Sequence, residues 1–274
     1  PSVDANAAEI RARLADYEAF GAVEQIDEPS DGYWHPLHAV HKPGKKVRLV
    51  LDLSRNFNDF LEPCPLRYSS VQSAADSSYK HCWYAKLDLS YMYLSFPLAA
   101  HLKRHFRFQF DGIFRQFTAV PFGLAPASRI ATDMMAVVAH CMARHGIRLT
   151  RYLDDILIIA ESKAQATQAL ELAQRIIASF GLVTNRSKTE GPSQRMEFLG
   201  VILDSVACTL SLSSRRVREL VAESTSILQR SRVTRDMLQS YAGKLAFAAQ
   251  VLPGAKPFSR RIFDTIAAMP AAST

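Results

Sequence analysis

The chain has 274 residues, of which 48% are hydrophobic and 22% are charged, so a core of ordinary size is expected. It has no apolar run of about 18 residues and no apolar N-terminal segment, which argues against a membrane span and a signal peptide. We therefore expect an intracellular protein, cytoplasmic or nuclear and not secreted. Its first residue is not Met, so we expect a piece of a longer chain.

The net charge of +7 is unevenly distributed along the chain. Residues 1–31 contain eight acidic and two basic residues, whereas residues 205–274 contain ten basic and four acidic ones. Basic clusters on separate segments favour a polyanionic partner. The alternative is a solvated basic face with no partner.

In the first half of the chain, residues 6–20 have the apolar spacing of an amphipathic helix. The apolar strings on either side of Pro43-Gly44 predict a hairpin, and those around Asp111-Gly112 predict another. The stretch "WYAKLDLSYMYLSFPL" begins as a strand and should end at Pro97.

In the second half, a helix is predicted from Pro126 to Gly146, and "IRLTRYLDDILIIA" should form two strands folded about its aspartates. Residues 162–180 should form a helix with a capping box, "MEFLGVILD" a short strand, and the chain from about residue 213 basic helices. The core positions expected there are Leu212, Val217, Leu220, Val221, Ile227 and Leu228. This order predicts the α+β class, with an antiparallel sheet covered by helices on one face and a helical appendage.

Two aspartates end apolar strands in the same way, although 66 residues separate them. Asp88 follows "AKL" and Asp154 follows "RYL". If the two strands are neighbours in a sheet, the carboxylates emerge at one edge, repel each other and require a hard cation such as Mg²⁺ or Mn²⁺. Two such ions are the standard clamp for attack at a phosphate. The alternative is that each Asp only caps a turn.

Five motifs follow one another in an order that resembles the reverse transcriptase family. They are "KPGKKVRLVLDLSRNFN", "LDLSYMYLSFPL", "VPFGLAPA", "YLDD" and "FLGVILD", spread over about residues 36–204. The string "YLDD" matches the Tyr-x-Asp-Asp signature of that family. The tail "YAGKLAFAAQVLPGAKPFSRRIFD" resembles enzymes of LTR-like retrotransposons, of the DIRS type that carries a tyrosine recombinase.

The resemblance implies a right-handed polymerase fold with fingers, palm and thumb. It divides the chain into an N-terminal extension with fingers (1–87), a palm (88–204) with an interleaved fingers segment near 98–125, and a helical thumb (205–274).

The resemblance also implies a metal site. Asp88 and Asp154 would hold two Mg²⁺ ions, for which Mn²⁺ could substitute, and the main-chain carbonyl of Leu89 would complete one shell. Asp155 would ligate more weakly or orient the turn, because adjacent strand residues point to opposite faces.

A nucleotide site is implied beside it. Lys42 and Arg48 would bind the triphosphate. Tyr93 takes the place of the family's sugar gate, which leaves no room for a 2′-hydroxyl, although a core aromatic is the alternative there. Phe122 and Gly123 would lie under the incoming base, and Phe122 departs from the Gln of some viral relatives.

Other positions concern proton transfer and the duplex. Lys188 is a candidate proton donor to pyrophosphate, or else an exposed Lys without a role. Contacts with template and primer are expected from Phe198, Leu199, Gly200, Arg215, Arg216 and Arg218.

The sequence thus predicts a nucleotidyltransferase, an RNA-directed DNA polymerase that extends a primer with dNTPs on an RNA or DNA template. No membrane partner is expected, and RNase H should lie elsewhere in a longer polyprotein. Two alternatives stay open. One is an RNA-dependent RNA polymerase, which Tyr93 disfavours. The other is a domesticated, non-catalytic RNA-binding scaffold, which the intact aspartates disfavour.

Overall fold

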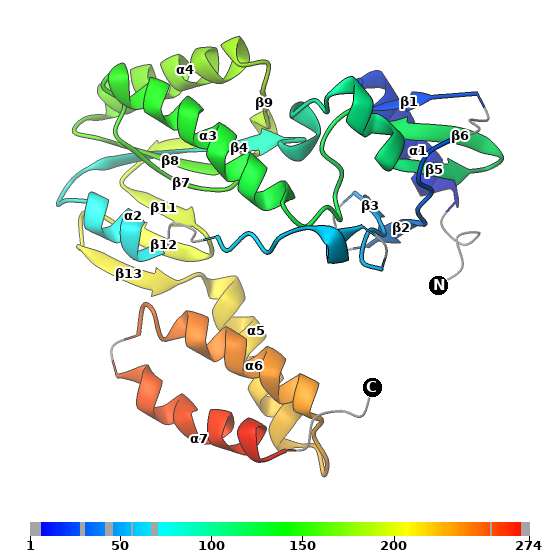
Figure 1. The fold of residues 1–274 in the computed structure, drawn as a ribbon. Helices are drawn as coiled ribbons and strands as arrows, with labels where there is room; N and C mark the ends of the chain where they lie inside the picture. The colour runs from blue at the N-terminus through cyan, green and yellow to red at the C-terminus, as the bar shows by residue number, and fades with distance from the viewer. Residues whose placement is uncertain are drawn as a thin grey trace. The chain divides into compact units, whose positions relative to one another are not determined.

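The computed structural model describes residues 7–27, 31–41, 46–55, 57–66, 71–252 and 254–269 (Figure 1). The chain forms two compact units. The first gathers residues 1–68, 88–145 and 174–185, and the second gathers 69–87, 146–173 and 186–274. The chain passes between the units within strand β4 (Trp83–Ser90) and within helix α4 (Lys163–Ser179).

The first unit begins with the predicted amphipathic helix. Helix α1 (Ala7–Ala19) buries Ile10, Leu14 and Tyr17. Strand β1 (Val23–Gln25) follows it and pairs with β6 (Ile113–Phe117), which in turn pairs with β5 (Arg107–Phe110). The β5–β6 hairpin reverses at Asp111 and Gly112, both with positive φ, as the sequence predicts.

The predicted fingers hairpin is also present in the first unit. Strands β2 (Leu37–Val40) and β3 (Arg48–Leu51) are antiparallel, with Leu37 opposite Leu51. The turn between them, residues 42–45, lies outside the described residues, and Lys42 with it. The short 3₁₀ helix η2 (Asn58–Phe60) follows β3.

The other elements of the first unit are helical turns and one long helix. The 3₁₀ helices η3 (Tyr93–Ser95) and η4 (Ala100–His105) come after β4, so this strand ends well before the predicted Pro97. Helix α3 (Ala127–Arg144) follows Pro126 and stops just before Gly146, which has φ of 78°, as predicted.

The central sheet has the strand order β10-β4-β8-β7, and β9 (Val183–Thr184) pairs with the end of β4. Strands β7 (Leu149–Tyr152) and β8 (Asp155–Ala160) are antiparallel (Figure 1). Strand β10 (Glu190–Ser193) is antiparallel to β4. The prediction of two strands folded about the aspartates is confirmed. Strand β8 is apolar and buried from Ile156 to Ala160, which anchors the hairpin in the core.

A separate sheet in the second unit contains β11 (Arg195–Phe198), β12 (Val201–Asp204) and β13 (Thr209–Leu212). The prediction of one strand over "MEFLGVILD" is therefore wrong. The chain reverses inside that string because Leu199 and Gly200 both have positive φ, of 53° and 81°.

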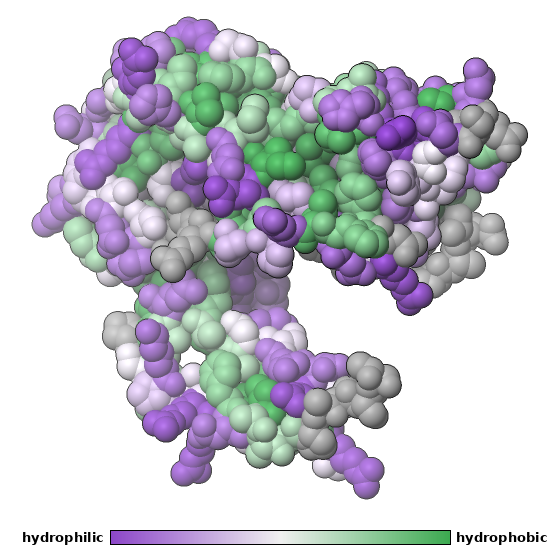
Figure 2. Space-filling view, viewed as in Figure 1, coloured by the Kyte–Doolittle hydropathy of each residue, from purple (hydrophilic) through white to green (hydrophobic). Residues whose placement is uncertain are grey.

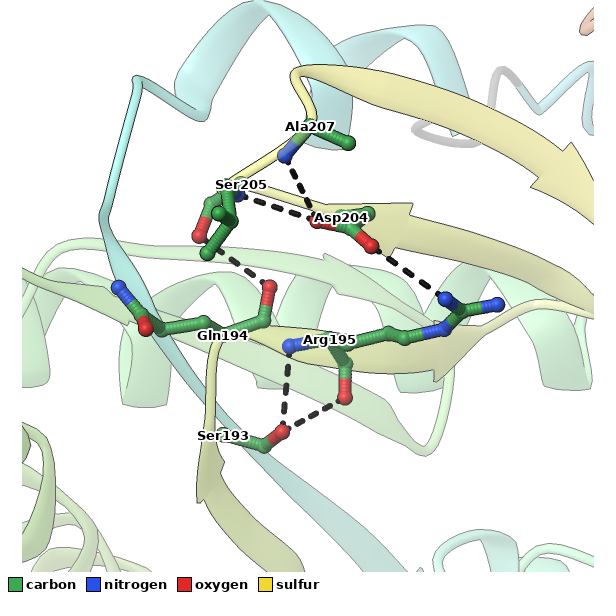
Figure 3. Close-up of polar contacts among 7 residues, drawn as sticks. Ser193, Gln194, Arg195, Asp204, Ser205 and Ala207 are labelled. Carbon is green, nitrogen blue, oxygen red and sulfur yellow. Dashed lines mark hydrogen bonds and ion pairs between the residues drawn. The ribbon is translucent and has the colours of Figure 1, made fainter.

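The turn after β12 is held by side chains (Figure 3). Asp204 Oδ1 accepts a hydrogen bond from the main-chain N of Ala207 at 2.9 Å, and its Oδ2 lies 3.5 Å from Arg195 NH1. The hydroxyl of Ser205 donates to the carbonyl of Cys82 at 2.6 Å. These contacts fix the β12–β13 turn and join it to the start of β4.

The core of the second unit joins both sheets to the short helix α2 (Val71–Ser77). Its buried members are Ala74, Cys82, Tyr84, Leu157, Ile159, Met196, Phe198 and Leu203. Helix α4 begins at the predicted cap, where Ser162 Oγ accepts from Gln165 N at 3.2 Å. Gln165 Oε1 in turn accepts from Glu161 N at 2.9 Å, one residue earlier than in a standard capping box.

The chain ends in helices α5 (Ser214–Leu228), α6 (Arg235–Ala248) and α7 (Ala255–Ala268). Of the core positions predicted on α5, Leu220 and Ile227 are half-buried, but Val221 and Leu228 are wrong, with 60% and 85% of them exposed. The reason is that α6 buries its apolar residues Leu238 and Ala242 together with Ile266 of α7, rather than against α5. Figure 2 accordingly shows hydrophobic side chains open at the surface of these helices among polar ones.

No helix within the described residues is both long enough and apolar enough to cross a membrane.

Candidate active site

Asp88 lies near the end of β4, and only 6% of it is exposed. Its neighbours Leu87 and Leu89 are buried as well, and its main-chain oxygen accepts a hydrogen bond from Asn185 N at 2.7 Å. Carboxylates are almost never this buried unless they are paired or bind a metal. The position is therefore a poor fit to a simple turn cap.

Asp154 and Asp155 occupy different kinds of position. Asp155 is the first residue of β8 and lies opposite Tyr152 of β7, so Leu153 and Asp154 form the two-residue turn between these strands. Both aspartates are partly exposed. Asp154 thus lies in the turn and Asp155 in the strand, so the two are not the successive strand residues from which the weaker role of Asp155 was argued.

Three of the motif turns contain a bulky residue in the left-handed region. The φ angles are 55° at Tyr91, after Asp88, 52° at Leu153, before Asp154, and 53° at Leu199 in the β11–β12 hairpin. Each such residue costs on the order of 1 kcal/mol or more, and such strain collects at functional sites. The strain supports a functional role for these turns.

The structure brings together three predicted nucleotide-binding residues, all in the first unit. The guanidinium carbon of Arg48 lies 4.8 Å from the centre of the Phe122 ring. The Phe122 and Tyr93 rings lie 5.2 Å apart at 61°, and Tyr93 Oη is 3.1 Å from Ser128 Oγ. Because a cation–π contact engages only the face of a guanidinium, the exposed Arg48 keeps donors for a phosphate.

The predicted Gly123 is placed by a close main-chain approach. Its φ is 107°, and a Cβ atom built on it would lie 2.0 Å from the carbonyl oxygen of Leu51. Leu51 N also donates to the carbonyl of Phe122 at 2.9 Å. The end of β3 and the Phe122–Gly123 turn are therefore in direct main-chain contact, which only glycine permits.

Sequence reasoning missed Asn58, whose side-chain amide bridges this turn. Its Nδ2 donates to the carbonyl of Gly123 at 2.9 Å, and its Oδ1 accepts from Ala125 N at 2.9 Å. The only signal in the sequence is its place as the last residue of the motif "KPGKKVRLVLDLSRNFN". Nothing local to Asn58 indicates a partner 65 residues away.

The segment after β3 is fixed by Asp52, which belongs to the same motif. The hydroxyl and the amide of Ser54 donate to Asp52 Oδ1, at 2.5 and 3.1 Å, and His38 Nε2 lies 3.3 Å from Oδ2. The Ser54 hydrogen bonds, with the help of His38, lower the pKa of Asp52 to about 2. The carboxylate is thus ionised at neutral pH, and its hydrogen bonds fix the main chain that follows β3.

The β11–β12 hairpin contains the predicted duplex contacts Phe198, Leu199 and Gly200, and all three are buried or half-buried. Phe198 is 2% exposed and belongs to the core, so a contact from this position has to come from its main chain. Gly200 is buried against Arg216, because a Cβ there would lie 2.0 Å from Arg216 Nε. Leu199 is half-buried between two core clusters.

The three predicted thumb arginines also differ. The Arg216 guanidinium lies 4.3 Å from the centre of the Phe247 ring and reaches the carbonyl of Leu199 at 3.5 Å, so it joins the β11–β12 hairpin to α5 and α6. Arg215 pairs with Glu219 at 2.9 Å on the exposed face of α5, and Arg218 is exposed. Arg215 and Arg218 are thus accessible to a polyanion.

Lys188 and Lys42 are the remaining residues that the sequence predicts at this site. Lys188 is exposed at the end of the 3₁₀ turn η5 (Arg186–Lys188). Lys42 lies outside the described residues. Their roles stay predictions.

The side-chain and main-chain oxygens predicted as ligands at Asp88, Leu89, Asp154 and Asp155 are of the kind that bind a divalent metal. Within the described ranges, no group of three His, Cys, Asp or Glu side chains is gathered closely enough to hold an ion. In the central sheet, strand β4 is the neighbour of β8. Carboxylate and carbonyl oxygens are the ligands that Mg²⁺ and Mn²⁺ prefer.

Comparisons with known proteins agree with the motifs. A family described as reverse transcriptase (RNA-dependent DNA polymerase) matches residues 38–203. The chain is 25% identical over 177 residues to the retrovirus-related Pol polyprotein from transposon gypsy of Drosophila melanogaster, over 62% of this chain and 17% of that protein. It is 22% identical over 174 residues to the Gag-Pol polyprotein of Walleye dermal sarcoma virus, over 61% of this chain and 10% of that protein. The chain thus spans only a small part of these relatives.

Solved structures share the fold. The foamy viral protease-reverse transcriptase dRH in complex with double-stranded DNA matches with a TM-score of 0.80 and 19% identity, over 96% of this chain and 44% of that one. Its complex with an RNA/DNA hybrid matches with a TM-score of 0.78 and 18% identity, over 98% of this chain and 34% of that one. These matches confirm the predicted α+β polymerase fold.

The relatives are polyproteins of a transposon and of a virus, which is consistent with the predicted LTR-like retroelement, while the DIRS type stays a prediction. The family match covers more than half of the chain, and it includes the first four motifs and all but the last residue of the fifth. This chain belongs to the reverse transcriptase family.

Proposed function

We propose that this chain catalyses RNA-directed DNA synthesis, transferring nucleotides from dNTPs to a primer 3′-hydroxyl on an RNA or DNA template. The observation that carries the proposal is the assembly of Arg48, Phe122 and Tyr93, which come from three separate motifs and meet in one unit. The foamy viral neighbours bound to double-stranded DNA or to an RNA/DNA hybrid support a duplex as the partner.

Asp88, Asp154 and the carbonyl of Leu89 would hold two Mg²⁺ ions, with a smaller contribution from Asp155 at the start of β8. When bound, such ions activate the attacking hydroxyl and neutralise charge on the leaving pyrophosphate. The buried Asp88 supplies a fixed negative charge for this purpose, and Asp154 supplies a second one from the turn.

The remaining residues bind and select the nucleotide. Arg48 neutralises phosphate charge while the Phe122 ring holds its guanidinium in place. Tyr93, braced against Phe122 and Ser128, excludes a 2′-hydroxyl. Asn58 fixes the turn that presents Phe122 and Gly123. On α5, Arg215 and Arg218 contact the duplex backbone without reading its sequence.

Primer extension on matched RNA and DNA templates tests the proposal. We expect dNTP incorporation on both templates with Mg²⁺ or Mn²⁺, and none after chelation of the metal. Preferred use of rNTPs would point to an RNA-dependent RNA polymerase. Duplex binding without extension in either metal would point to a non-catalytic scaffold. Either result would refute the proposed function.

Replacing Tyr93 by Val should relax sugar selection. Removing the ring opens space for a 2′-hydroxyl, so rNTP use relative to dNTP use should rise by about 10- to 100-fold, the range over which pockets discriminate small groups. Single-nucleotide kcat/KM values for a dNTP and its rNTP measure the ratio. Tyr93→Phe is the matched control, because it keeps the ring while it loses the hydroxyl that contacts Ser128, and it should keep the selectivity. An unchanged ratio in Tyr93→Val would remove the gate role.

Replacing Asn58 should weaken nucleotide binding by loosening the Phe122–Gly123 turn. Asn58→Ala loses both hydrogen bonds, so we expect the dNTP KM to rise about 3- to 10-fold and the stability to fall by about 1–2 kcal/mol. Asn58→Asp is the matched variant: its carboxylate still accepts from Ala125 N but cannot donate to the Gly123 carbonyl. Steady-state kinetics and denaturant unfolding check both effects. A wild-type dNTP KM in Asn58→Ala would contradict the assignment.

A further inference from the structure

Helix α1, in the acidic N-terminal segment, contacts Tyr91, a residue of the Asp88 motif "LDLSYMYLSFPL". The Tyr91 ring is contacted by α1 and the residue after it: the guanidinium carbon of Arg13 lies 4.9 Å from its centre, and the rings of Phe20 and Tyr17 lie 5.0 and 6.1 Å away. Arg13 NH1 also donates to Tyr91 Oη at 3.0 Å. All of these residues belong to the first unit.

Tyr91 lies next to the turn that contains Tyr93, so contacts on its ring can fix the main chain of that turn. It follows Asp88 by three residues, precedes Tyr93 by two, and has φ of 55°. Its carbonyl accepts from the amide and the hydroxyl of Ser95, at 3.0 and 3.1 Å, and so closes the turn that contains Tyr93. Tyrosine resists this backbone conformation, so contacts on the ring have to hold it there.

The Arg13 side chain is itself held in place by several contacts. Its side chain is 15% exposed, and its guanidinium lies over the rings of both Tyr17 and Tyr91. Arg13 NH1 also donates to Asp16 Oδ2 at 3.1 Å, and the same oxygen accepts from Lys46 Nζ at 3.2 Å. Burial alone would raise the pKa of Asp16, but donation from Lys46 and Arg13 outweighs it and lowers this pKa below its usual value.

Helix α1 therefore contacts both segments that supply nucleotide-binding residues. Through Asp16 it reaches Lys46, two residues before Arg48, and through Arg13 it reaches Tyr91, two residues before Tyr93. Arg48 and Tyr93 in turn both pack on the Phe122 ring. Helix α1 is thus linked to the segments of both Arg48 and Tyr93.

We propose that Arg13 is a positioning residue that acts through Tyr91 to hold the Tyr93 ring in the place where it selects the sugar. The inference rests on the proposed function, because it assigns a task only if Tyr93 is the gate. It gives the N-terminal helix a specific role in substrate selection, beyond the stability that its buried Leu14 and Tyr17 provide.

A purely structural role and a positioning role lead to different results. If Arg13 only stabilised the fold, its loss would lower the active fraction and reduce kcat for dNTPs and rNTPs alike, leaving their ratio unchanged. If it positions Tyr93, the Tyr93 turn becomes mobile in the folded enzyme, and the discrimination between the two sugars falls. The ratio of the two kcat/KM values therefore separates the roles.

The experiment compares Arg13→Ala and Tyr91→Ala with wild type in single-nucleotide extension, measuring kcat and KM for a dNTP and its rNTP. We expect both variants to raise relative rNTP use by about 3- to 10-fold, mainly through KM, since about 1 kcal/mol of ring contact is lost. Arg13→Lys keeps the charge and a donor but loses the planar stack, so its ratio should fall between wild type and Arg13→Ala.

The matched control is Arg11→Ala, on the same helix. It removes an equal charge from a side chain that is 60% exposed and pairs with Asp111. Its ratio should equal that of wild type. If Arg13→Ala does not fold, Arg13→Lys and Tyr91→Phe carry the test, and a wild-type ratio in both overturns the proposal.

Tyr93→Val, measured in parallel, separates the two levels of the argument. If it relaxes selection while the Arg13 and Tyr91 variants do not, the positioning role alone is overturned. If it leaves selection unchanged, the gate itself is overturned, and the positioning role with it.

Discussion

Replacing Asp154 by Asn is expected to abolish primer extension while leaving duplex binding nearly unchanged. The amide has the size and shape of the carboxylate but lacks its charge, so the site loses affinity for divalent ions without losing volume. We expect a fall in kcat of at least ~10³-fold, which corresponds to about 4 kcal/mol of transition-state stabilisation. Rapid-quench extension with saturating Mg²⁺ measures it, and binding of a labelled primer–template provides the second measurement.

Asp88→Asn should have an effect of the same size, because Asp88 is the buried carboxylate of β4. Asp155→Asn should cost less, since this residue begins β8 and pairs across the hairpin with Tyr152. The order of the three effects is therefore part of the prediction. A larger loss in Asp155→Asn than in Asp154→Asn would reverse the assignment of the ligands.

The matched control for charge is Asp133→Asn. Asp133 is exposed on α3 and pairs with Arg129 one helix turn away at 2.7 Å. Exposed pairs of this kind contribute about 0–1 kcal/mol, so this variant should extend primers like wild type. Extension at the wild-type rate by Asp154→Asn would refute the metal site, whatever the duplex affinity.

The local elements of this fold could be predicted because their signals are local. Asp111-Gly112 reverses the β5–β6 hairpin, and Pro126 begins α3 just after the motif turn, as their backbone preferences require. The β7–β8 hairpin was predictable for another reason: an apolar run interrupted by two charges cannot continue as one buried strand.

The misses share a different physical cause. Apolar spacing reports that a helix is amphipathic but not which neighbour covers it, and so Val221 and Leu228 of α5 were assigned to a core that α6 and α7 form instead. Leu199 gave no turn signal because leucine rarely adopts positive φ, although here it does.

The candidate site likewise contains residues that could be predicted from the sequence and residues that could not. The motif residues Arg48, Tyr93 and Phe122 could be named from the sequence, and the structure brings them together. The residues that brace them, Asn58 and Arg13, could not, because each acts on a partner more than 60 residues away through a side chain common on any surface. Bracing contacts leave no pattern in one sequence.

Replacing Gly123 by Ala should damage both the stability and the nucleotide site. The added Cβ would lie 2.0 Å from the carbonyl oxygen of Leu51, which is main chain and cannot turn aside, and φ of 107° is strained for any L side chain. The turn or the end of β3 has to move. We expect a loss of about 2–4 kcal/mol in unfolding free energy, from overpacking and backbone strain together.

Movement there should also displace Phe122, on whose ring Arg48 and Tyr93 pack. The KM for dNTPs should therefore rise about tenfold or more, since a tenfold change requires only ~1.4 kcal/mol of lost binding. Denaturant unfolding and single-nucleotide kinetics, each at a temperature at which the variant is folded, measure the two effects independently.

Gly112→Ala is the matched control for backbone strain. Gly112 also has positive φ, of 73°, but a Cβ there would meet nothing within 4 Å. This variant should lose only about 1 kcal/mol and keep the wild-type dNTP KM. The difference between the two variants isolates the contact between the Gly123 turn and Leu51. If the two lost the same stability and kept the same KM, that close approach would have no part in shaping the nucleotide site, and Phe122 would have to be held by Asn58 alone.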